Sequence, residues 1–496
     1  MWREDAKVAV SFTDQRGYPL RPPFHPPVRY PELPDSPLDP TNRLFPWVRQ
    51  TLFQLGLDED NFGTPQWNPL GHVVRPGMTV LIKPNTVRHN HPDGKDVFSI
   101  VTHASLIRPM LDYVCLALRG EGRILVGDSQ MVDSRFDEAW RVTGLAPLLD
   151  WYRQHTTLPI EGLDLREVRA VRSWCGGKWD RKRVQQDPRG YQIVDLGEQS
   201  NFRDIDPQRL RIGIANPRRT CECHSEGRHE YLFPKSVLAA DAIISIPKLK
   251  THRRAGVTLS VKGFFGLVAG RDALPHYQTG SVKEGGDEYI HPSLRKRLFS
   301  RLHDVVLTDA PNPVKLISAL ARNSIWWSRK VVPFEDNIIE AMWYGNDTIW
   351  RTLHDIAQVL FYTDKSGRLC ATPQRGHFCL IDGIVGGQRN GPVNPDPIVP
   401  GVLLAGGNPV AIDAVAASLM GFDVRAIPTI NNGLNRLAGD GDFFQEIEVI
   451  DDGRTVRMDE FLATRHLNYE PHPQWQGRLE RPVGVPLPAR EAPCPC

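Results

Sequence analysis

Short apolar runs that end in polar residues alternate along this chain with longer stretches whose apolar residues recur at helical spacing. The runs TVLIKPN at 79–85, RILVGDS at 123–129 and AIISI at 242–246 have the composition of buried strands. The segment THASLIRPMLDYVCLALRG between the first two has the pattern of a helix that ends at Gly120. Strand, helix and strand in succession indicate a parallel sheet connected by crossover helices.

The chain has 496 residues, more than one compact domain usually needs. We therefore predict an α/β fold, Rossmann-like, in which a parallel or mixed sheet has helices on both faces and carries helical and irregular insertions. The predicted parts are an N-terminal strand, Pro-rich segment and helix over 1–75, the core over 76–290 and 371–430, an irregular insertion at about 150–235 within the core, a helical insertion over 291–370, and an irregular tail over 431–496 that ends in CPC.

Composition narrows the class of protein. The formal net charge is only +2, and no nucleic-acid reader motif or aromatic-basic repeat occurs, so we expect no nucleic-acid partner. No stretch approaches the roughly 20 apolar residues of a membrane span, and the start lacks a signal-peptide pattern, so we expect a cytoplasmic protein. The eight cysteines match neither a CxxC zinc pattern nor a ferredoxin run, and CECH at 221–224 lacks the second ligand pair that structural zinc needs. No metal site is predicted.

Polar residues follow the predicted strands at the end where open α/β sheets bind ligands. Lys83 and Asn85 follow the first of these strands, and Asp128 and Ser129 close the second. His103, in THASL, is placed to cap the helix between them. We expect the strand-end residues to lie around one binding site.

The stretch PKLKTH at 247–252 is the most unbalanced in charge. Between residues 242 and 271 there are six Lys and Arg and no Asp or Glu. Extended backbone sends Lys248, Lys250 and His252 to one side, an arrangement that suits a carboxylate or phosphate group. Neighbouring ammonium groups also lower each other's pKa. Arg253 and Arg254 interrupt the alternation and are expected to be solvated or paired with acidic residues of another segment.

The next segment, GVTLSVKGFFGLVAG, extends the same candidate site. Thr258 and Lys262 are four residues apart, which places them on one face of either a strand or a helix. The glycines at 263, 266 and 270 permit close approach of the backbone or tight turns, and His276 follows soon enough to join the site.

The block IDGIVGGQRNGP at 381–392 is the other candidate. Asp382 at the end of a strand could balance the lysines as a catalytic group, or it could be a helix cap or form a buried ion pair with Lys248 or Lys250. The glycines after it, with Gly386, Gly387 and Asn390 as the expected ligand contacts, predict a loop shaped for a ligand. Asp413 lies near the start of the helix that follows Asn408, where a carboxylate is favoured by the helix dipole.

Taken in order, the motifs LIKPN, VGDS, ADAIISIPKLKTHRRAGVTLSVKGFFGLVAG, IDGIVGGQRNGP and GGNPVAIDAVAASLMGFD resemble the bacterial and archaeal family called domain of unknown function 362. The resemblance spans roughly residues 78–425, and it implies no settled activity. Some members carry an attached ferredoxin-like iron-sulfur domain, but the cysteine run of such a domain is missing from this sequence.

Three functional hypotheses follow. The favoured one is an enzyme that acts on a small anionic metabolite, a carboxylate or a phosphate, and its cofactor and oligomeric state are left open. The alternatives are a non-catalytic protein that binds an anion or an acidic partner, and a metal or iron-sulfur redox protein. The expected catalytic residues are His252 as acid or base, Lys250 and Asp382. The expected binding residues are Lys83, Asn85, Asp128, Ser129, Lys248, Thr258, Lys262, His276, Gly386, Gly387 and Asn390.

Overall fold

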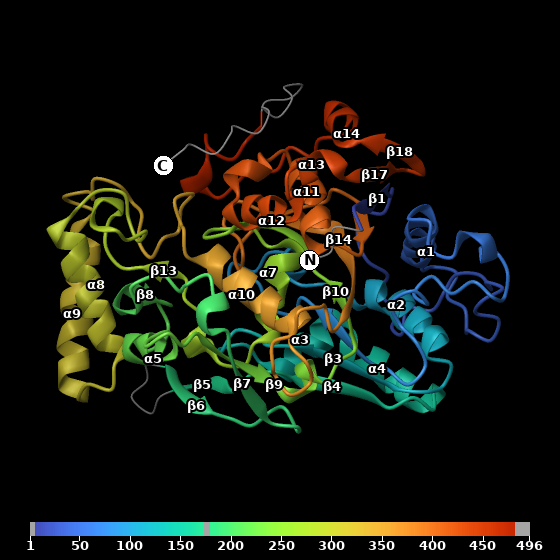
Figure 1. Ribbon diagram of the computed structural model, residues 1–496, viewed down its shortest axis with the longest axis horizontal. Helices are drawn as coiled ribbons and strands as arrows, with labels where there is room; N and C mark the ends of the chain where they lie inside the picture. The colour runs from blue at the N-terminus through green and yellow to red at the C-terminus, as the bar shows by residue number, and fades with distance from the viewer. Residues whose placement is uncertain (1–4, 173–178, 482–496) are drawn as a thin grey trace.

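The computed structural model describes residues 5–172 and 179–481. Cys175 and the CPC end of the predicted tail lie outside these residues. A mixed sheet of twelve strands forms the centre of the molecule (Figure 1). Its main path runs in the order β18 (Arg454–Arg457), β17 (Glu448–Asp451), β1 (Lys7–Phe12), β16 (Val402–Gly406), β14 (Gly376–Gln388), β10 (Ala242–Ile246), β2 (Thr79–Pro84), β3 (Arg123–Asp128) and β4 (Ile160–Asp164). The remaining strands are β11 (Lys248–His252), which pairs with β14, β12 (Gly256–Val257), which pairs with β11, and β15 (Asp396–Ile398), which pairs with β14.

The five strands from β14 to β4 run parallel to one another, whereas β16 is antiparallel to both β14 and β1. Parallel neighbours need crossover connections, and helices supply them on both faces of the sheet. The predicted α/β class, with a parallel or mixed sheet, is thereby confirmed.

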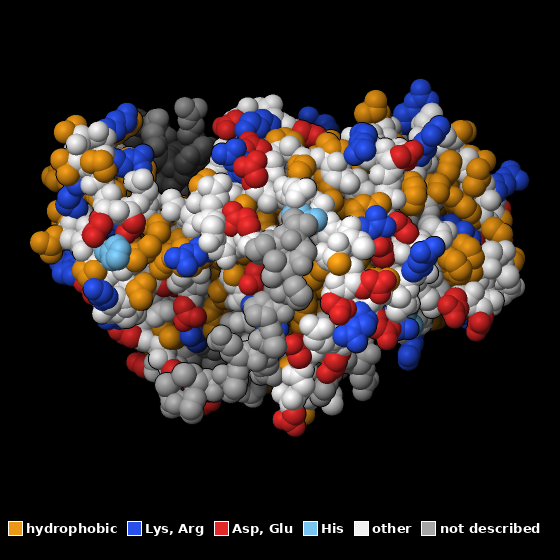
Figure 2. All heavy atoms as spheres, turned by 90° about the horizontal axis from the view of Figure 1, so that it is seen from above, with side chains coloured by type: hydrophobic (Ala, Val, Ile, Leu, Met, Phe, Trp, Pro, Cys, Tyr) orange, Lys and Arg blue, Asp and Glu red, His pale blue; other side chains and the backbone are white. Residues whose placement is uncertain are grey.

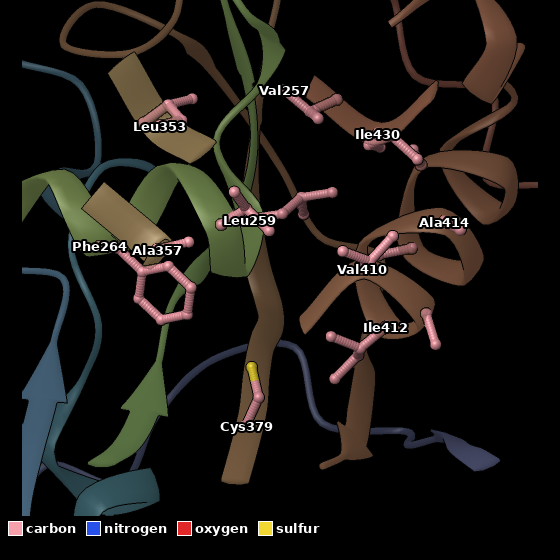
Figure 3. Packing of buried hydrophobic residues seen from close by; sticks show 14 of the residues in the cluster. Val257, Leu259, Phe264, Leu353, Ala357, Cys379, Val410, Ile412, Ala414 and Ile430 are labelled. Atoms are coloured by element: carbon pink, nitrogen blue, oxygen red, sulfur yellow. The ribbon is translucent and has the colours of Figure 1, made fainter. Parts of the chain in front are cut away.

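Alternate residues of each strand belong to different cores. In β2, Val80 and Ile82 are buried on one face and Leu81 on the other. The first face is covered by α1 (Leu44–Gln54), α2 (Ala104–Leu118), α3 (Phe136–Thr143) and α4 (Leu145–His155). The second is covered by α7 (Leu259–Gly263), α10 (Ile349–Tyr362), α11 (Pro409–Met420) and α12 (Pro428–Ala438). Figure 3 shows Leu259, Phe264, Ala357 and Val410 packed together in this second core.

Smaller elements surround this core. They are the strand pairs β5 (Val168–Arg172) with β6 (Trp179–Arg183), β7 (Tyr191–Asp195) with β9 (Glu230–Pro234), and β8 (Leu210–Arg211) with β13 (Tyr277–Gln278), and the helices α5 (Pro217–Cys223), α6 (Lys235–Leu238), α8 (Leu294–Leu307), α9 (Asn312–Ser328), α13 (Phe443–Glu446) and α14 (Met458–Thr464). The predicted helical insertion is represented by α8, α9 and α10. None of the helices in the described ranges is both long enough and apolar enough to span a bilayer.

Two segments differ from the sequence prediction. Residues 431–496 were expected to form an irregular tail, but the described part of this segment contains most of α12 and all of α13, β17, β18 and α14. The reason is that β17 pairs in parallel with β1 at the opposite end of the chain, a partner that local sequence does not reveal. The glycine-rich block after Asp382 was expected to be a loop, yet β14 continues through it to Gln388.

Candidate functional site

A cavity of about 210 Å³ lies beyond the carboxyl ends of β2 and β3 and beside β11. This is the position where open α/β sheets bind ligands. Nine of the residues predicted from the sequence line it, namely Lys83, Asn85, Asp128, Ser129, Lys250, His252, Thr258, Lys262 and His276. The structure therefore gathers residues from four separate segments around one hollow.

Positive charge predominates in the lining. The cationic side chains are Lys83, Lys250, Arg253, Arg254, Lys262 and Arg271, and the carboxylates are Asp128 and Glu340. Both carboxylates already have a cationic partner, because Asp128 lies 3.1 Å from the Lys83 ammonium and Glu340 lies 2.7 Å from the Arg254 guanidinium. Among the residues that the structure describes, Lys250, Arg253 and Lys262 form no ion pair with either of these carboxylates.

Lys262 is the clearest case of an uncompensated cation. It forms no ion pair with the residues that the structure describes, and its ammonium lies 3.9 Å from the centre of the Phe265 ring. Burial, followed by the charges of Arg271, Lys83 and Arg254, lowers the pKa of Lys262 to about 7. A small change in its surroundings therefore decides whether this amine is charged at neutral pH.

Lys250 is held by backbone carbonyls. Its ammonium donates hydrogen bonds to the carbonyl oxygens of Ile100 and Pro392, at 2.8 and 3.0 Å. Burial and then the charges of Lys248 and Lys262 hold the pKa of Lys250 well below its ordinary value. An anion in the cavity would offset these repulsions and favour the charged amine.

Thr258 contributes a hydroxyl group with an unmet hydrogen-bonding capacity. The residue is 6% exposed and lines the cavity, yet its Oγ1 is buried and has no hydrogen-bond partner among the residues that the structure describes. A buried hydroxyl without a partner costs free energy of order 1–3 kcal/mol. A polar atom of a ligand in the cavity could remove this cost.

The two histidines of the cavity present opposite hydrogen-bonding groups. Nδ1 of His252 accepts from the backbone N–H groups of Arg254 and Ala255, both at 3.1 Å, which in the neutral ring leaves the proton on Nε2. Nδ1 of His276 lies 2.7 Å from the carbonyl oxygen of Leu274 and donates to it, which leaves a lone pair on Nε2. Burial, together with nearby cations, holds the pKa of both rings well below the ordinary value, so both are neutral.

Part of the cavity lining is apolar. Its members are Val87, Met131, Val132, Ile212, Ile214, Phe265 and Val393. The cavity is also smaller than the roughly 300–1,000 Å³ of sites for drug-sized ligands. It therefore has room for a compact molecule that combines a charged end with a small apolar part.

Asp382 and Lys248 do not line the cavity. They form a fully buried ion pair at 2.8 Å, and the Tyr18 hydroxyl donates to Asp382 at 2.6 Å and accepts from Lys248 at 2.6 Å. Of the alternatives considered for Asp382, the structure thus contains the buried ion pair. The prediction that Lys248 lies in the cavity beside Lys250 and His252 was wrong. Its side chain instead contacts Tyr18, a residue of the Pro-rich segment.

Gly386, Gly387 and Asn390 also lie outside the lining. The glycines instead allow close packing within the protein. A Cβ atom on Gly386 would lie 1.9 Å from the Tyr469 hydroxyl, and one on Gly387 would lie 2.6 Å from the Ser99 carbonyl oxygen. The prediction that these residues contact a ligand in the cavity is therefore corrected. The two glycines contact neighbouring chain segments instead.

Gly266 is the glycine that matters at the cavity itself. A Cβ atom there would lie 2.0 Å from Oδ1 of Asp128 and 2.8 Å from Nζ of Lys83. Its carbonyl also accepts a hydrogen bond from the backbone N–H of Ser129, at 2.6 Å. The absence of a side chain at this position lets the short helical turn Phe264–Leu267 lie directly on the Lys83–Asp128 pair.

Asp413 of α11 supports the segment that carries Lys262. Its carboxylate accepts from the backbone N–H groups of Ser260 and Val261, at 2.7 and 2.9 Å, at the beginning of α7. Burial raises the pKa of Asp413 to about 8. The sequence placed this carboxylate near the start of its own helix, but its hydrogen bonds go to the start of another one.

Sequence reasoning missed several members of the lining. Glu340 comes from the helical insertion, Ile212 comes from the predicted irregular insertion, and Arg271 was counted as a cation without a place in the site. Arg254 forms an ion pair with Glu340, an acidic residue of another segment, which is one of the two outcomes predicted for it. The charge imbalance of residues 242–271 was the only signal that could have assigned Arg271 to the cavity.

Other predicted features lie elsewhere. His103 caps α2, since its side chain accepts from the backbone N–H of Ser105, as expected. His224 of the CECH motif contacts His229, with 3.2 Å between the two Nδ1 atoms, and the carbonyl oxygen of Ala273. Within the described ranges, no three His, Cys, Asp or Glu side chains are grouped so that they could hold a metal ion.

Fold and cavity together define a mixed α/β protein with a cationic hollow at one edge of its sheet. Residues 210–418 match the family model described as Domain of unknown function (DUF362). The match confirms the family predicted from the motifs. It contains Lys250, His252, Lys262 and His276, whereas the cavity residue Lys83 precedes it. No curated protein and no solved structure matches the chain.

Proposed function

We propose that this protein is an enzyme that acts on a small anionic metabolite bound in the cavity. The observation that carries the proposal is Lys262, a cation that forms no ion pair within the described part of the chain and lies in a lining where cations outnumber carboxylates. Such an imbalance is destabilising until an anion compensates it. Lys262, Lys250 and the hydroxyl of Thr258 are the groups proposed to hold the anionic end of the metabolite.

The histidines give the proposal its chemistry. The lone pair on Nε2 makes His276 the proposed general base, and the proton on Nε2 makes His252 a hydrogen-bond donor to an oxygen of the substrate. This revises the role of His252, which the sequence had suggested as acid or base. One neutral imidazole that accepts a proton and another that donates a hydrogen bond suit a reaction in which a proton leaves one atom of the substrate while negative charge develops on an oxygen.

The apolar lining residues limit the substrate class. A carboxylate or phosphate ester with a short hydrocarbon portion would contact both the cations and the apolar residues, whereas an inorganic anion would bind through the cations alone and leave Ile212, Met131 and Phe265 in contact with water. A location in the cytoplasm is proposed because Cys115, Cys221, Cys223, Cys370 and Cys379 are free thiols. No nucleic-acid role is proposed.

A thermal-shift screen of carboxylates, phosphate esters and nucleotides tests the proposal. A ligand at about 100 times its dissociation constant stabilises the folded state by about 2.7 kcal/mol. We expect hits among small anions, and we expect them to disappear in Lys262→Met but not in the matched control Lys283→Met, which removes an exposed lysine away from the cavity. A screen in which no small anion raises the melting temperature would contradict the proposal.

Turnover separates an enzyme from a binding protein. For a ligand found in the screen, His276→Gln should lower kcat with little effect on KM, and His252→Gln should lower kcat/KM for every substrate that keeps the polarised oxygen. Saturable binding with no conversion of any ligand would favour the non-catalytic alternative.

A further inference from the structure

Helices α8 and α9 form a hairpin at one end of the molecule, away from the central sheet (Figure 1). The two helices pack against each other, but little of the rest of the protein packs against α9. Of its 17 residues, only Ser318 is buried. A helix this exposed gains little stability from tertiary packing on its outer faces.

The exposed side of α9 carries a stripe of large apolar side chains. Ile317, Leu320, Trp327 and, just beyond the helix, Val331 are 67%, 60%, 59% and 86% exposed. Their spacing of three, seven and four residues places them on one helical face. Leu294 at the start of α8 is also 78% exposed. Large apolar residues grouped on a surface mark a site of association.

The same hairpin is strongly basic. Residues 294–332 contain eight Lys and Arg but only two Asp and no Glu. Six of these cations form no ion pair with a carboxylate among the residues described, and they are Arg295, Arg301, Lys315, Arg322, Arg329 and Lys330. In Figure 2 the end of the molecule formed by this hairpin shows apolar and basic side chains next to each other.

Two tryptophans join the apolar and basic parts of the hairpin. The guanidinium of Arg329 lies 3.2 Å from the centre of the Trp326 ring, and the ammonium of Lys330 lies 4.4 Å from the centre of the Trp327 ring. Tryptophan beside basic residues is typical of helices that lie in a membrane interface, where the ring enters the headgroup region and the cations meet lipid phosphates.

We propose that the α8–α9 hairpin docks on an anionic lipid surface, with the apolar stripe in the headgroup region and the basic residues against the phosphates. Charge complementarity selects this occupant, because two copies of so basic a hairpin would repel each other. Docking would also bring the lipid surface to a helix that touches the cavity wall. His303 of α8 lies 2.9 Å from the carbonyl oxygen of Gly213, between the lining residues Ile212 and Ile214.

Co-sedimentation of the full chain with vesicles tests this docking. We expect binding to vesicles made of equal parts of phosphatidylcholine and phosphatidylserine, and little binding to phosphatidylcholine alone. Each cation near an anionic membrane contributes about fivefold to affinity, so Arg329→Gln/Lys330→Gln should weaken binding about 25-fold. Ile317→Ser/Trp327→Ser should weaken it at least about tenfold by removing apolar insertion.

The matched control is Leu20→Ser/Arg454→Gln, which removes an exposed leucine and an exposed arginine outside the hairpin and should bind as the unchanged protein does. Circular dichroism establishes that all variants are folded. Equal binding to both vesicle types, loss of binding in the control variant, or a dimer in analytical ultracentrifugation that depends on Trp327 would each overturn the proposal. The outcome is independent of whether the cavity turns over a substrate.

Discussion

Lys262 should make anion binding depend on pH. Its pKa is about 7 in the empty cavity, below the ordinary value of 10.5, because burial and neighbouring cations disfavour the charged amine. A bound anion favours the charged form, so the pKa must rise on binding and a proton must be taken up. Affinity is then constant below about pH 6 and falls as the pH rises above about 7, by close to tenfold for each pH unit.

The expected magnitude follows from this linkage. Between about pH 7 and pH 9, the titration of Lys262 should raise the dissociation constant of a ligand with constant charge about 50-fold, as long as the pKa in the complex is about 10 or higher. Sulfate is a suitable probe, since its own charge does not change over this range. Isothermal titration calorimetry in two buffers of different ionisation enthalpy measures both the affinity and the protons taken up.

Lys262→Arg is the informative variant, because its guanidinium stays charged throughout. It should bind sulfate with an affinity that falls less steeply between about pH 7 and pH 9 than in the unchanged protein, because only the proton uptake of Lys250 remains. The reasoning is refuted if the unchanged protein binds sulfate equally well across this range, or if Lys262→Arg retains the full slope.

Three further changes test how the cavity is built. Gly266→Ala places a methyl group against Asp128 and should weaken sulfate binding, measured by calorimetry, about tenfold or more. The control is Gly263→Ala, whose Cβ atom would have its nearest neighbour at 3.7 Å and which should leave sulfate binding unchanged. Equal effects of the two substitutions would contradict this. Asp382→Leu should lower the free energy of unfolding, measured with urea, by about 3–5 kcal/mol because it leaves the Lys248 ammonium buried without its carboxylate. The double variant with Lys248→Met should recover most of that loss. No recovery would count against the ion pair. Asp413→Ala removes two hydrogen bonds from the start of α7, so it should lower the free energy of unfolding by about 2 kcal/mol and also lower the affinity for sulfate. An unchanged affinity would show that α7 does not need these hydrogen bonds.

The features predicted from the sequence were those that local pattern determines. Apolar runs and helical spacing were enough to predict the mixed α/β sheet. The polar residues at the ends of β2 and β3, together with Lys250 and His252 of β11, line one cavity because parallel strands end at a common edge. Charge imbalance over 242–271 pointed correctly to the segment that contains Lys262.

The parts that were missed depend on partners distant in the chain. Tyr18, in a Pro-rich segment without a periodic pattern, contacts Lys248 and Asp382 and helps to hold this pair apart from the cavity. β17 joins the sheet through its parallel pairing with β1. Alternation showed which side of β11 the three polar residues share, but it could not show that the side chains of Lys248 and Lys250 reach different surroundings.

The most direct test of the central claim is a crystal structure of the protein soaked in selenate, in which anomalous scattering identifies the anion. The account predicts a selenate ion in the cavity, within hydrogen-bonding distance of Lys262 and the Thr258 hydroxyl. A cavity that contains only water, with selenate bound at surface positions, would contradict it.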